Sequence, residues 1–222
     1  MKHLITTIII SLIFGLNGFT QDNKKWSRFK MYSKDTVSLK RNYQFYLSQI
    51  DVKKGEKVAS VGAGNGDQEL QISIFNEGID WTLQDIDSTA LNPKNFKQVL
   101  HYFENLTQKS INEKFSFVIG NEKKTNLPED TYNKVLIINT YHEITERASI
   151  LTDIHHALKK NGRVIVVESM AKKKGQRHAG CHDLKLLEPD FLREMERFNF
   201  KFLSKIEGKK RNSRSYYTFE KI

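Results

Sequence analysis

The stretch that decides the fold is Val58-Ala59-Ser60-Val61-Gly62-Ala63-Gly64-Asn65-Gly66-Asp67. Its first half predicts a short buried strand, and its three alternate glycines predict a tight turn into a helix. Because glycine has no Cβ, such a turn lets a ligand approach the backbone closely. Open α/β sheets bind ligands at turns of this kind, at the carboxyl end of a strand. The motif therefore marks either a nucleotide-type site or only a tight connection between strand and helix.

A second strand-like segment, residues 81–87, places an acid about 20 residues beyond the glycine turn. A carboxylate at this offset can accept hydrogen bonds from the two hydroxyls of a ribose. The glycine turn and Asp85 together resemble the class I S-adenosylmethionine-dependent methyltransferases. The resemblance implies that the cofactor is S-adenosylmethionine, that Gly62, Gly64 and Gly66 shape its pocket, and that Asp85 binds its ribose.

Composition excludes several classes of protein. The chain has 222 residues, enough for one α/β domain with a sizeable core. Its net charge of +10 sits partly in short runs such as residues 172–174 and 209–211, which form either a solvated surface or one attracted to acidic substrates and anionic membranes. No nucleic-acid-binding signature is present, so we expect no specific nucleic-acid partner. The single cysteine, Cys181, excludes an intrachain disulfide, and we expect no metal.

The amino terminus predicts an export signal. A basic start is followed by an apolar run over residues 4–16, and the chain becomes polar after residue 20. The run is shorter than the roughly 20 residues that span a bilayer. We therefore expect residues 1–20 to be a cleaved signal peptide and the protein to be periplasmic or secreted, the alternative being an uncleaved signal that anchors it to the membrane. Since S-adenosylmethionine is made and kept inside cells, an exported member of the family would meet little of it.

The remaining pattern predicts an α/β fold. Residues 21–50 form a lead-in segment and a helix over 35–50 with Asp35 as its N-cap, and residues 51–222 form the methyltransferase-like domain. Strand-like and helical segments then alternate, and Asn161-Gly162 is expected to stop the helix over 146–158. Two final strands form an antiparallel hairpin. We predict a doubly wound, mainly parallel seven-stranded sheet closed by that hairpin, as in the methyltransferases. The expected strands cover residues 80–85, 115–119, 134–139, 163–168, 200–207 and 215–220, and the expected helices begin near residues 67, 92, 146 and 189.

The resemblance covers roughly residues 40–222 and implies the remaining site residues. The family usually has an acid where this chain has Ser60, and often an aspartate where it has Asn121. Ser60 can still accept a hydrogen bond, and the amide oxygen of Asn121 is expected to take over the role of the aspartate toward the adenine amino group. Each departure removes a charge-assisted hydrogen bond, at about 1–2 kcal/mol. The implied cofactor-binding residues are Ser60, Gly62, Gly64, Gly66, Asp85, Ile86, Asn121, Glu122 and Asn139.

Polar residues at the ends of the later strands are the candidates for chemistry. Tyr141 and His142 follow the fourth strand and are expected to face the acceptor, with His142 as a general base. The alternative for His142 is a hydrogen bond to a loop or stacking on the ligand. Glu168 orients an acceptor or forms an ion pair. The cluster from His178 to Asp183 contacts the acceptor, and it suits a metal only if His178 and His182 share one helical face.

Three functions fit these observations. The first is an S-adenosylmethionine-dependent methyltransferase with a small-molecule acceptor, since the chain has little room for an inserted domain that binds macromolecules. The second is an exported, non-catalytic binding protein that retains the fold, motivated by the export signal, Ser60 and Asn121. The third is a methyltransferase that acts on an exposed polymer or lipid, motivated by the basic runs.

Overall fold

A computed structural model describes residues 33–208 and 214–222. The predicted signal peptide, most of the lead-in segment and the basic turn at residues 209–213 lie outside the described residues. The described residues form one sheet in the strand order β3-β2-β1-β4-β5-β7-β6. The strands are β1 (Lys57–Val61), β2 (Asp80–Asp85), β3 (Lys114–Ile119), β4 (Tyr132–Ile138), β5 (Leu158–Glu168), β6 (Phe200–Ile206) and β7 (Ser215–Lys221).

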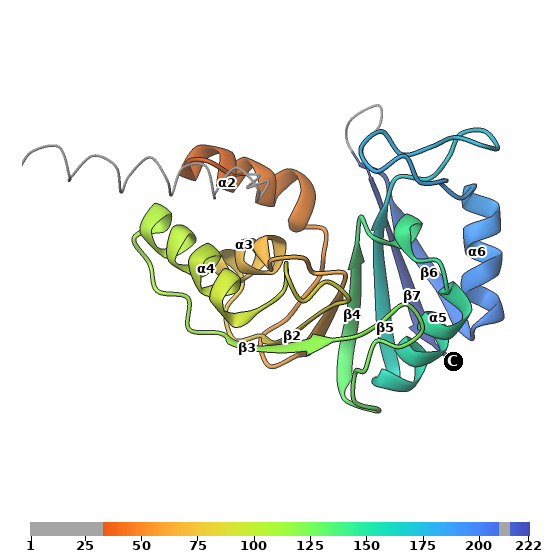
Figure 1. Cartoon of the computed structure of the whole chain (residues 1–222), viewed down its shortest axis with the longest axis horizontal. Helices are drawn as coiled ribbons and strands as arrows, with labels where there is room; N and C mark the ends of the chain where they lie inside the picture. The colour runs from red at the N-terminus through yellow and green to blue at the C-terminus, as the bar shows by residue number, and fades with distance from the viewer. Residues whose placement is uncertain (1–32, 209–213) are drawn as a thin grey trace, which may run out of the picture.

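The strand directions confirm the predicted fold class. β1 pairs in parallel with both β2 and β4, while β2 continues to β3 and β4 continues to β5, also in parallel. β7 is antiparallel to both β5 and β6, which makes the expected terminal hairpin. In Figure 1 the arrows of β4 and β5 point the same way, and β6 and β7 lie beyond them. The carboxyl ends of the five parallel strands therefore share one edge of the sheet.

Helices cover both faces of the sheet (Figure 1). Side chains alternate along a strand, so Val58 of β1 packs into one core and Ala59 into the other. The first core lies under α2, α3 and α4, and the second lies under α5 and α6. The helices are α2 (Thr36–Asn42), the π-helix η1 (Tyr43–Leu47), α3 (Asp67–Phe75), α4 (Pro93–Thr107), the 3₁₀ helix η2 (Tyr141–Glu143), α5 (Arg147–Ala157) and α6 (Glu188–Arg197).

The amino-terminal helix begins as expected. The Asp35 carboxylate accepts the backbone N–H of Ser38 at 2.6 Å, and the Ser38 hydroxyl oxygen accepts the Asp35 N–H in return. Both groups would otherwise lack a partner in the first turn of the helix. The helix predicted over residues 35–50 is a short α-helix that continues as a π-helix and ends at Leu47.

The helix predicted over residues 67–77 ends two residues early, whereas the helix predicted over residues 146–158 ends within one residue of its predicted end, although Asn161-Gly162 does not stop it. α3 stops at Phe75, because Asn76 is extended and its side-chain amide donates to the Ile72 carbonyl. α5 stops at Ala157, before Asn161-Gly162. Leu158 is fully buried and already pairs with Tyr132 of β4, so β5 starts earlier than residue 163. A register shift in this pairing accommodates the tight bend, in which Asn161 has a φ of 59°.

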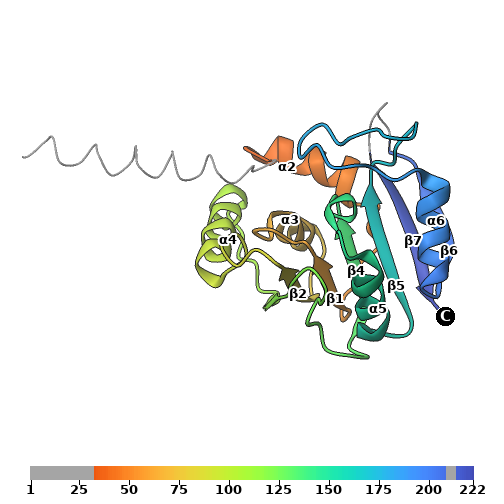
Figure 2. The ribbon, with the colours of Figure 1, turned by 45° about the vertical axis from the view of Figure 1, so that its right-hand side comes forward.

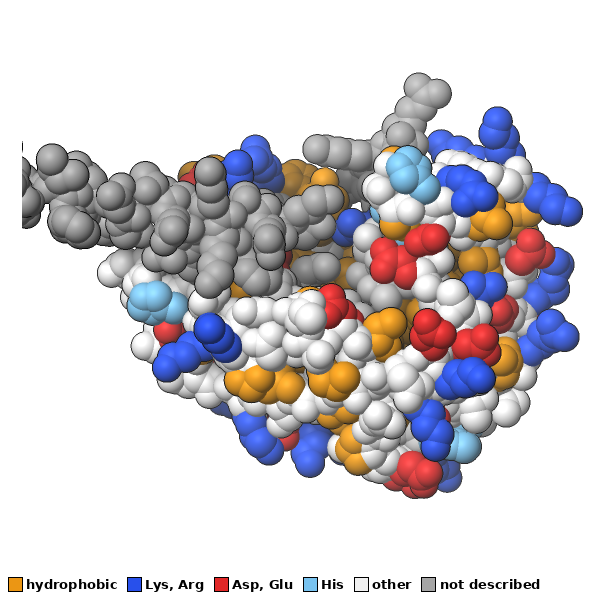
Figure 3. All heavy atoms as spheres, in the orientation of Figure 1, with side chains coloured by type: hydrophobic (Ala, Val, Ile, Leu, Met, Phe, Trp, Pro, Cys, Tyr) orange, Lys and Arg blue, Asp and Glu red, His pale blue; other side chains and the backbone are white. Residues whose placement is uncertain are grey.

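The surface carries mixed charge on the face shown in Figure 3, where basic side chains lie mostly toward the rim and acidic side chains lie between them. Among the helices that the structure describes, none is long and apolar enough to cross a membrane.

Candidate functional site

A cavity of about 150 Å³ lies at the carboxyl ends of β1, β2 and β4. The glycine turn, the end of β2, the loop after β3 and the segment after β4 each contribute part of its wall. This is the edge at which parallel α/β sheets bind ligands. The lining residues are Val61, Gly62, Gln84, Asp85, Ile86, Asn121, Glu122, Thr140, Glu143, Ile144, Thr145 and Ile150.

The three glycines of the turn have different surroundings. All three have positive φ, at 73°, 58° and 78° for Gly62, Gly64 and Gly66. A Cβ on Gly62 would collide with the Thr140 side chain, and one on Gly66 would meet Leu83 and Phe96. A Cβ on Gly64 would meet no described atom within 4 Å. Gly62 and Gly66 are therefore required by packing, whereas Gly64 presents open backbone to a ligand.

Asp85 ends β2 directly beside this turn. Its Oδ2 accepts the Gly64 N–H at 2.7 Å, and its Oδ1 accepts the Asp87 N–H at 2.9 Å. These bonds fix the carboxylate at the cavity wall. Each oxygen has a second lone pair, so the group can also accept two hydroxyls from a ligand.

The loop after β3 forms the opposite wall. The side-chain oxygen of Asn121 accepts the N–H groups of Lys123 and Lys124, each at 2.9 Å. Its lone pairs are thereby used, so the side-chain amide can offer a ligand its N–H donors. Glu122 and Ile86 also line the cavity. Ile86 is 57% exposed, so its apolar side chain is available to pack against a flat ligand.

Ser60 does not line the cavity. It is buried, and its hydroxyl donates to Oε1 of Glu69 at 2.5 Å. Glu69 is 2% exposed, and its Oε2 finds no hydrogen-bond partner among the described residues. Burial raises the pKa of Glu69 to about 7, and the nearby charge of Asp85 adds to the rise. A buried carboxyl therefore stands within hydrogen-bond distance of the position at which the family usually has an acid.

Sequence reasoning missed Glu69 because it lies inside a helix. Six of the nine residues of α3 are buried, Glu69 among them, but no spacing in the sequence marks this acid as buried. Its neighbour Asp67 is also buried, with a pKa raised to about 7 by burial and by the charge of Glu69. Gln71 donates to Asp67 at 2.8 Å.

Asn139 follows β4, the strand that pairs with β1. It has a φ of 55°, and its backbone N–H donates to the Val167 carbonyl at 2.8 Å. Its side-chain oxygen is buried and has no partner within the described part of the chain. Asn139 and Glu69 thus leave two acceptor oxygens unsatisfied near the glycine turn.

Tyr141 lies away from the cavity. It is 1% exposed, its ring packs on Phe191 of α6, and its hydroxyl donates to Glu194 at 2.8 Å. Burial and the negative charge of Glu194 raise its pKa far above the usual range. The expected contact of Tyr141 with an acceptor stays a prediction, and this placement does not favour it.

His142 is buried and held by a carboxylate. Its Nδ1 lies 2.7 Å from Oε2 of Glu168, the last residue of β5. Burial lowers the pKa of His142, but the hydrogen bond and charge of Glu168 outweigh burial and raise the pKa above its usual value. Its Nε2 has no hydrogen-bond partner among the described residues. Nε2 is therefore the atom through which His142 can act. It lies 3.6 Å from Oε1 of Glu143, and Glu143 lines the cavity.

The predicted polar cluster lies in the loop between β5 and α6, and Figure 2 shows this segment arching over the carboxyl ends of β4 and β5. The ring of His178 lies 4.3 Å from that of His142. Cys181, His182 and Asp183 are exposed. The structure thus brings His178 to His142, although His178 and His182 do not share a helix.

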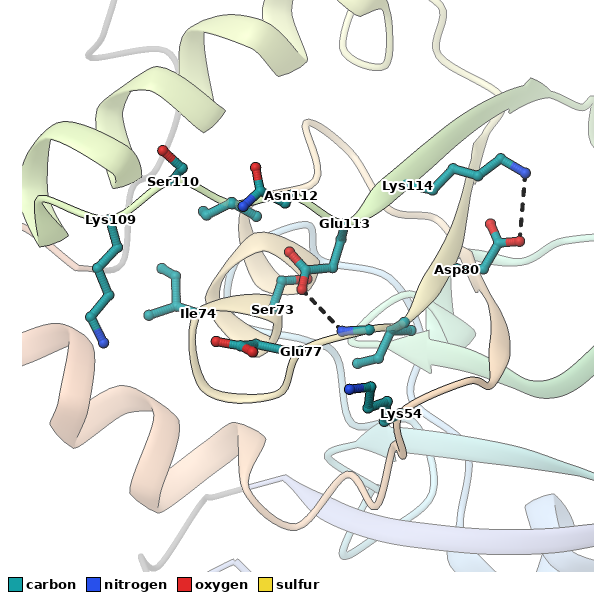
Figure 4. Close-up of a pocket in the computed structure, with 13 residues that line it drawn as sticks. Lys54, Ser73, Ile74, Glu77, Asp80, Lys109, Ser110, Asn112, Glu113 and Lys114 are labelled. Carbon is teal, nitrogen blue, oxygen red and sulfur yellow. Dashed lines mark hydrogen bonds and ion pairs between the residues drawn. The ribbon is translucent and has the colours of Figure 1, made fainter.

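A larger cavity of about 520 Å³ lies at the other edge of the sheet (Figure 4). It surrounds the amino ends of β2 and β3, where Glu113 accepts the Gly78 N–H at 3.2 Å and Lys114 pairs with Asp80 at 3.6 Å. Strand topology favours the smaller cavity as the functional one, because only the carboxyl edge carries the glycine turn.

Relatives of known sequence share part of the chain. The ubiquinone/menaquinone biosynthesis C-methyltransferase of Pectobacterium carotovorum is 25% identical over 126 residues, which is 56% of this chain and 47% of that protein. The sterol 24-C-methyltransferase of Pneumocystis carinii is 24% identical over 143 residues, 62% of this chain and 36% of that protein. The chain thus spans less than half the length of these curated relatives.

Solved structures show the same fold. A SAM-dependent methyltransferase from Aquifex aeolicus superposes with a TM-score of 0.64 at 15% identity, covering 86% of this chain and all of that one. The [4+2]-cyclase SpnF superposes with a TM-score of 0.63 at 13% identity, covering 82% of this chain and 80% of that one. Since a cyclase shares the fold, the fold alone does not decide the reaction. The family model of the O-methyltransferase domain matches residues 6–221, and the chain belongs to this family.

Proposed function

We propose that the protein is an S-adenosylmethionine-dependent methyltransferase with a small-molecule acceptor. Family membership supports methyl transfer. The observation that carries the cofactor assignment is the turn at Gly64, where open backbone meets the fixed carboxylate of Asp85 at the cavity wall.

The residues at the cavity fit the adenosine part of this cofactor. Asp85 would accept the ribose hydroxyls, Asn121 would donate to the adenine and Ile86 would pack on its face. At about 150 Å³ the cavity is smaller than most ligand pockets, which begin near roughly 300 Å³. The methionine part would therefore lie along the open side of the turn at Gly64.

We further propose that Glu69, whose neutral form the fold favours, ionises beside a bound ammonium group and then supplies the charge that the family usually places at Ser60. In this chain the carboxyl lies on the helix α3, at Glu69, and not on the strand β1, where the family usually has it. The Ser60 hydroxyl donates to Oε1 of Glu69, and Oε2 has no partner among the described residues. An ammonium group offers three donors, and the unsatisfied oxygens of Glu69 and Asn139 are acceptors. The departure at Ser60 then costs the site less than the sequence alone suggests.

The bound cofactor supplies a methyl group on a positively charged sulfur, so the protein has to position the acceptor and remove its proton. Nδ1 of His142 is held by Glu168, which leaves the buried Nε2 as the nitrogen without a partner among the described residues. Nε2 is the atom that would take the acceptor's proton. A hydroxyl acceptor suits both this arrangement and the family.

The test is an assay of S-adenosylhomocysteine released from S-adenosylmethionine with a panel of small phenols, alcohols and amines. We expect release with at least one hydroxyl compound and none from Asp85→Asn. Binding of the cofactor without turnover on any acceptor would instead support the non-catalytic binding protein, which the departures at Ser60 and Asn121 motivate.

A further inference from the structure

Three side chains near the acceptor edge bring metal-ligand atoms together. An imidazole nitrogen of His142, one of His178 and the Cys181 sulfur all lie within 4.8 Å of one another. His142 comes from η2, after β4, whereas His178 and Cys181 come from the loop between β5 and α6. Figure 2 shows this loop passing over the ends of β4 and β5, which explains how residues so distant in the sequence meet.

One ring nitrogen of the buried member, His142, lacks a partner among the described residues. The His142 side chain is 1% exposed, and its Nε2 has no hydrogen bond within the described residues. The Glu143 carboxylate lies 3.6 Å from Nε2, beyond hydrogen-bond distance. The ring of His178 lies 4.3 Å from the ring of His142, so the loop packs against this histidine. A buried nitrogen that is left unsatisfied in this way points to a ligand.

The other nitrogen of His142 is arranged as in metal-binding histidines. Nδ1 lies 2.7 Å from the Glu168 carboxylate, which is 2% exposed. Histidine ligands commonly donate their second N–H to a carboxylate, which fixes the ring and leaves the other nitrogen to the metal.

The loop holds its two ligands close together by its own backbone. The N–H of His178 donates to the Asp183 carbonyl at 2.8 Å, and residues 177 and 184 form an antiparallel bridge. The Cys181 sulfur lies 3.3 Å from Nδ1 of His178. Two ligands of a tetrahedral zinc ion are about 3.5 Å apart, given metal–ligand distances of about 2.0–2.3 Å. The loop therefore needs little movement to bind an ion.

A fourth ligand is also at hand. Glu143, Cys181 and Asp183 form a second group whose ligand atoms lie within 4.8 Å of one another. Cys181 belongs to both groups, so carboxylate oxygens of Glu143 and Asp183 lie within 4.8 Å of its sulfur, and that of Glu143 also lies 3.6 Å from Nε2 of His142.

We propose that His142, His178 and Cys181 bind a divalent cation of the zinc class, with Glu143 or Asp183 completing its ligands. A mixed set of imidazole, thiolate and carboxylate suits zinc, and an opening to solvent at Cys181 leaves access for exchange. No metal was expected from the sequence, because the spacing of His178 and His182 suits one only if both lie on one face of a helix. The site does not depend on methyl transfer. A cation bound to Nε2 of His142 prevents this nitrogen from acting as a base. The protein therefore cannot bind the cation and use His142 as a base at the same time.

The test is a titration of the metal-free, reduced protein with cobalt(II), followed by absorption. We expect one equivalent to bind and to produce both the visible bands of tetrahedral cobalt and the near-ultraviolet band of a cobalt–thiolate bond. Cys181→Ser should lose the thiolate band. His178→Ala should weaken binding by about tenfold or more. Zinc should displace the cobalt.

The matched control is His182→Asn. His182 lies in the same exposed loop, next to Cys181, but belongs to neither group of ligands, and asparagine tolerates its φ of 65°. Its cobalt spectrum should equal that of the wild type. The proposal is overturned if the protein binds no stoichiometric cobalt, or if His178→Ala and Cys181→Ser bind it as the wild type does. Circular dichroism verifies that each variant is folded.

Discussion

Replacing Glu69 with glutamine should remove a large part of the protein's loss of stability between about pH 5 and pH 8. Glu69 is 2% exposed, and only one of its oxygens has a hydrogen-bond partner among the described residues. The fold therefore favours the protonated, neutral form of this carboxyl. Glutamine is neutral at every pH and keeps an oxygen to accept the Ser60 hydroxyl.

The magnitude follows from the pKa. Burial raises the pKa of Glu69 from 4.5 to about 7, a difference of about 2.5 units. At 1.36 kcal/mol per unit this corresponds to about 3 kcal/mol. Because the folded pKa lies above the unfolded one, this stability is present below about pH 4.5 and is lost as the pH rises through about 7. Asp67, whose pKa is also raised to about 7, adds a loss of the same sign.

The assay is urea unfolding of both proteins at a series of pH values. The free energy of unfolding of the wild type should fall by about 3 kcal/mol more than that of Glu69→Gln across this range. Glu77→Gln, which replaces an exposed acid just beyond the same helix, is the control and should follow the wild type. Equal pH dependence in the wild type and Glu69→Gln would refute the reasoning, since Glu69 would then ionise as easily in the folded protein as in the unfolded one.

Four further substitutions test the site and its support. Gly64→Ala should still fold, because its Cβ meets open space, and its positive φ should cost only about 1 kcal/mol. This variant should lose cofactor affinity in calorimetry. Gly62→Ala should instead unfold at much lower urea, because its Cβ would collide with Thr140. Lys134→Met should lower the free energy of unfolding by about 2 kcal/mol, because it leaves Glu56 without the ammonium 2.7 Å away; an unchanged urea midpoint would contradict this. Tyr141→Phe should cost about 1 kcal/mol of stability and leave kcat within about twofold, whereas a large fall in kcat would place its hydroxyl in catalysis.

The architecture was predictable because its signals are local. The alternate glycines at residues 62–66 each occupy positive φ, and Asp35 caps its helix by bonds within one turn. Buried strands are marked by unbroken apolar runs such as residues 135–138. Helix ends were less predictable, because they depend on tertiary contacts. The helix over residues 147–157 ends close to its predicted end, but it ends because Leu158 already pairs with β4 and not because of Asn161-Gly162.

The candidate site was predictable in its cofactor half and less so elsewhere. Asp85 and Asn121 reach the cavity because strand ends meet at one edge of the sheet. No spacing rule reveals that Glu69 reaches Ser60, since that contact depends on how helix and strand pack. The approach of His178 to His142 depends on the path of a long loop, which sequence alone does not give.

The most direct test of the cofactor assignment is a calorimetric titration of the protein with S-adenosylmethionine and with S-adenosylhomocysteine. The account predicts micromolar binding of at least one of them, its loss in Asp85→Ala, and its retention in Asp80→Ala, which changes the acid at the opposite end of the same strand. No binding at millimolar ligand, or equal binding by Asp85→Ala and the wild type, would contradict it.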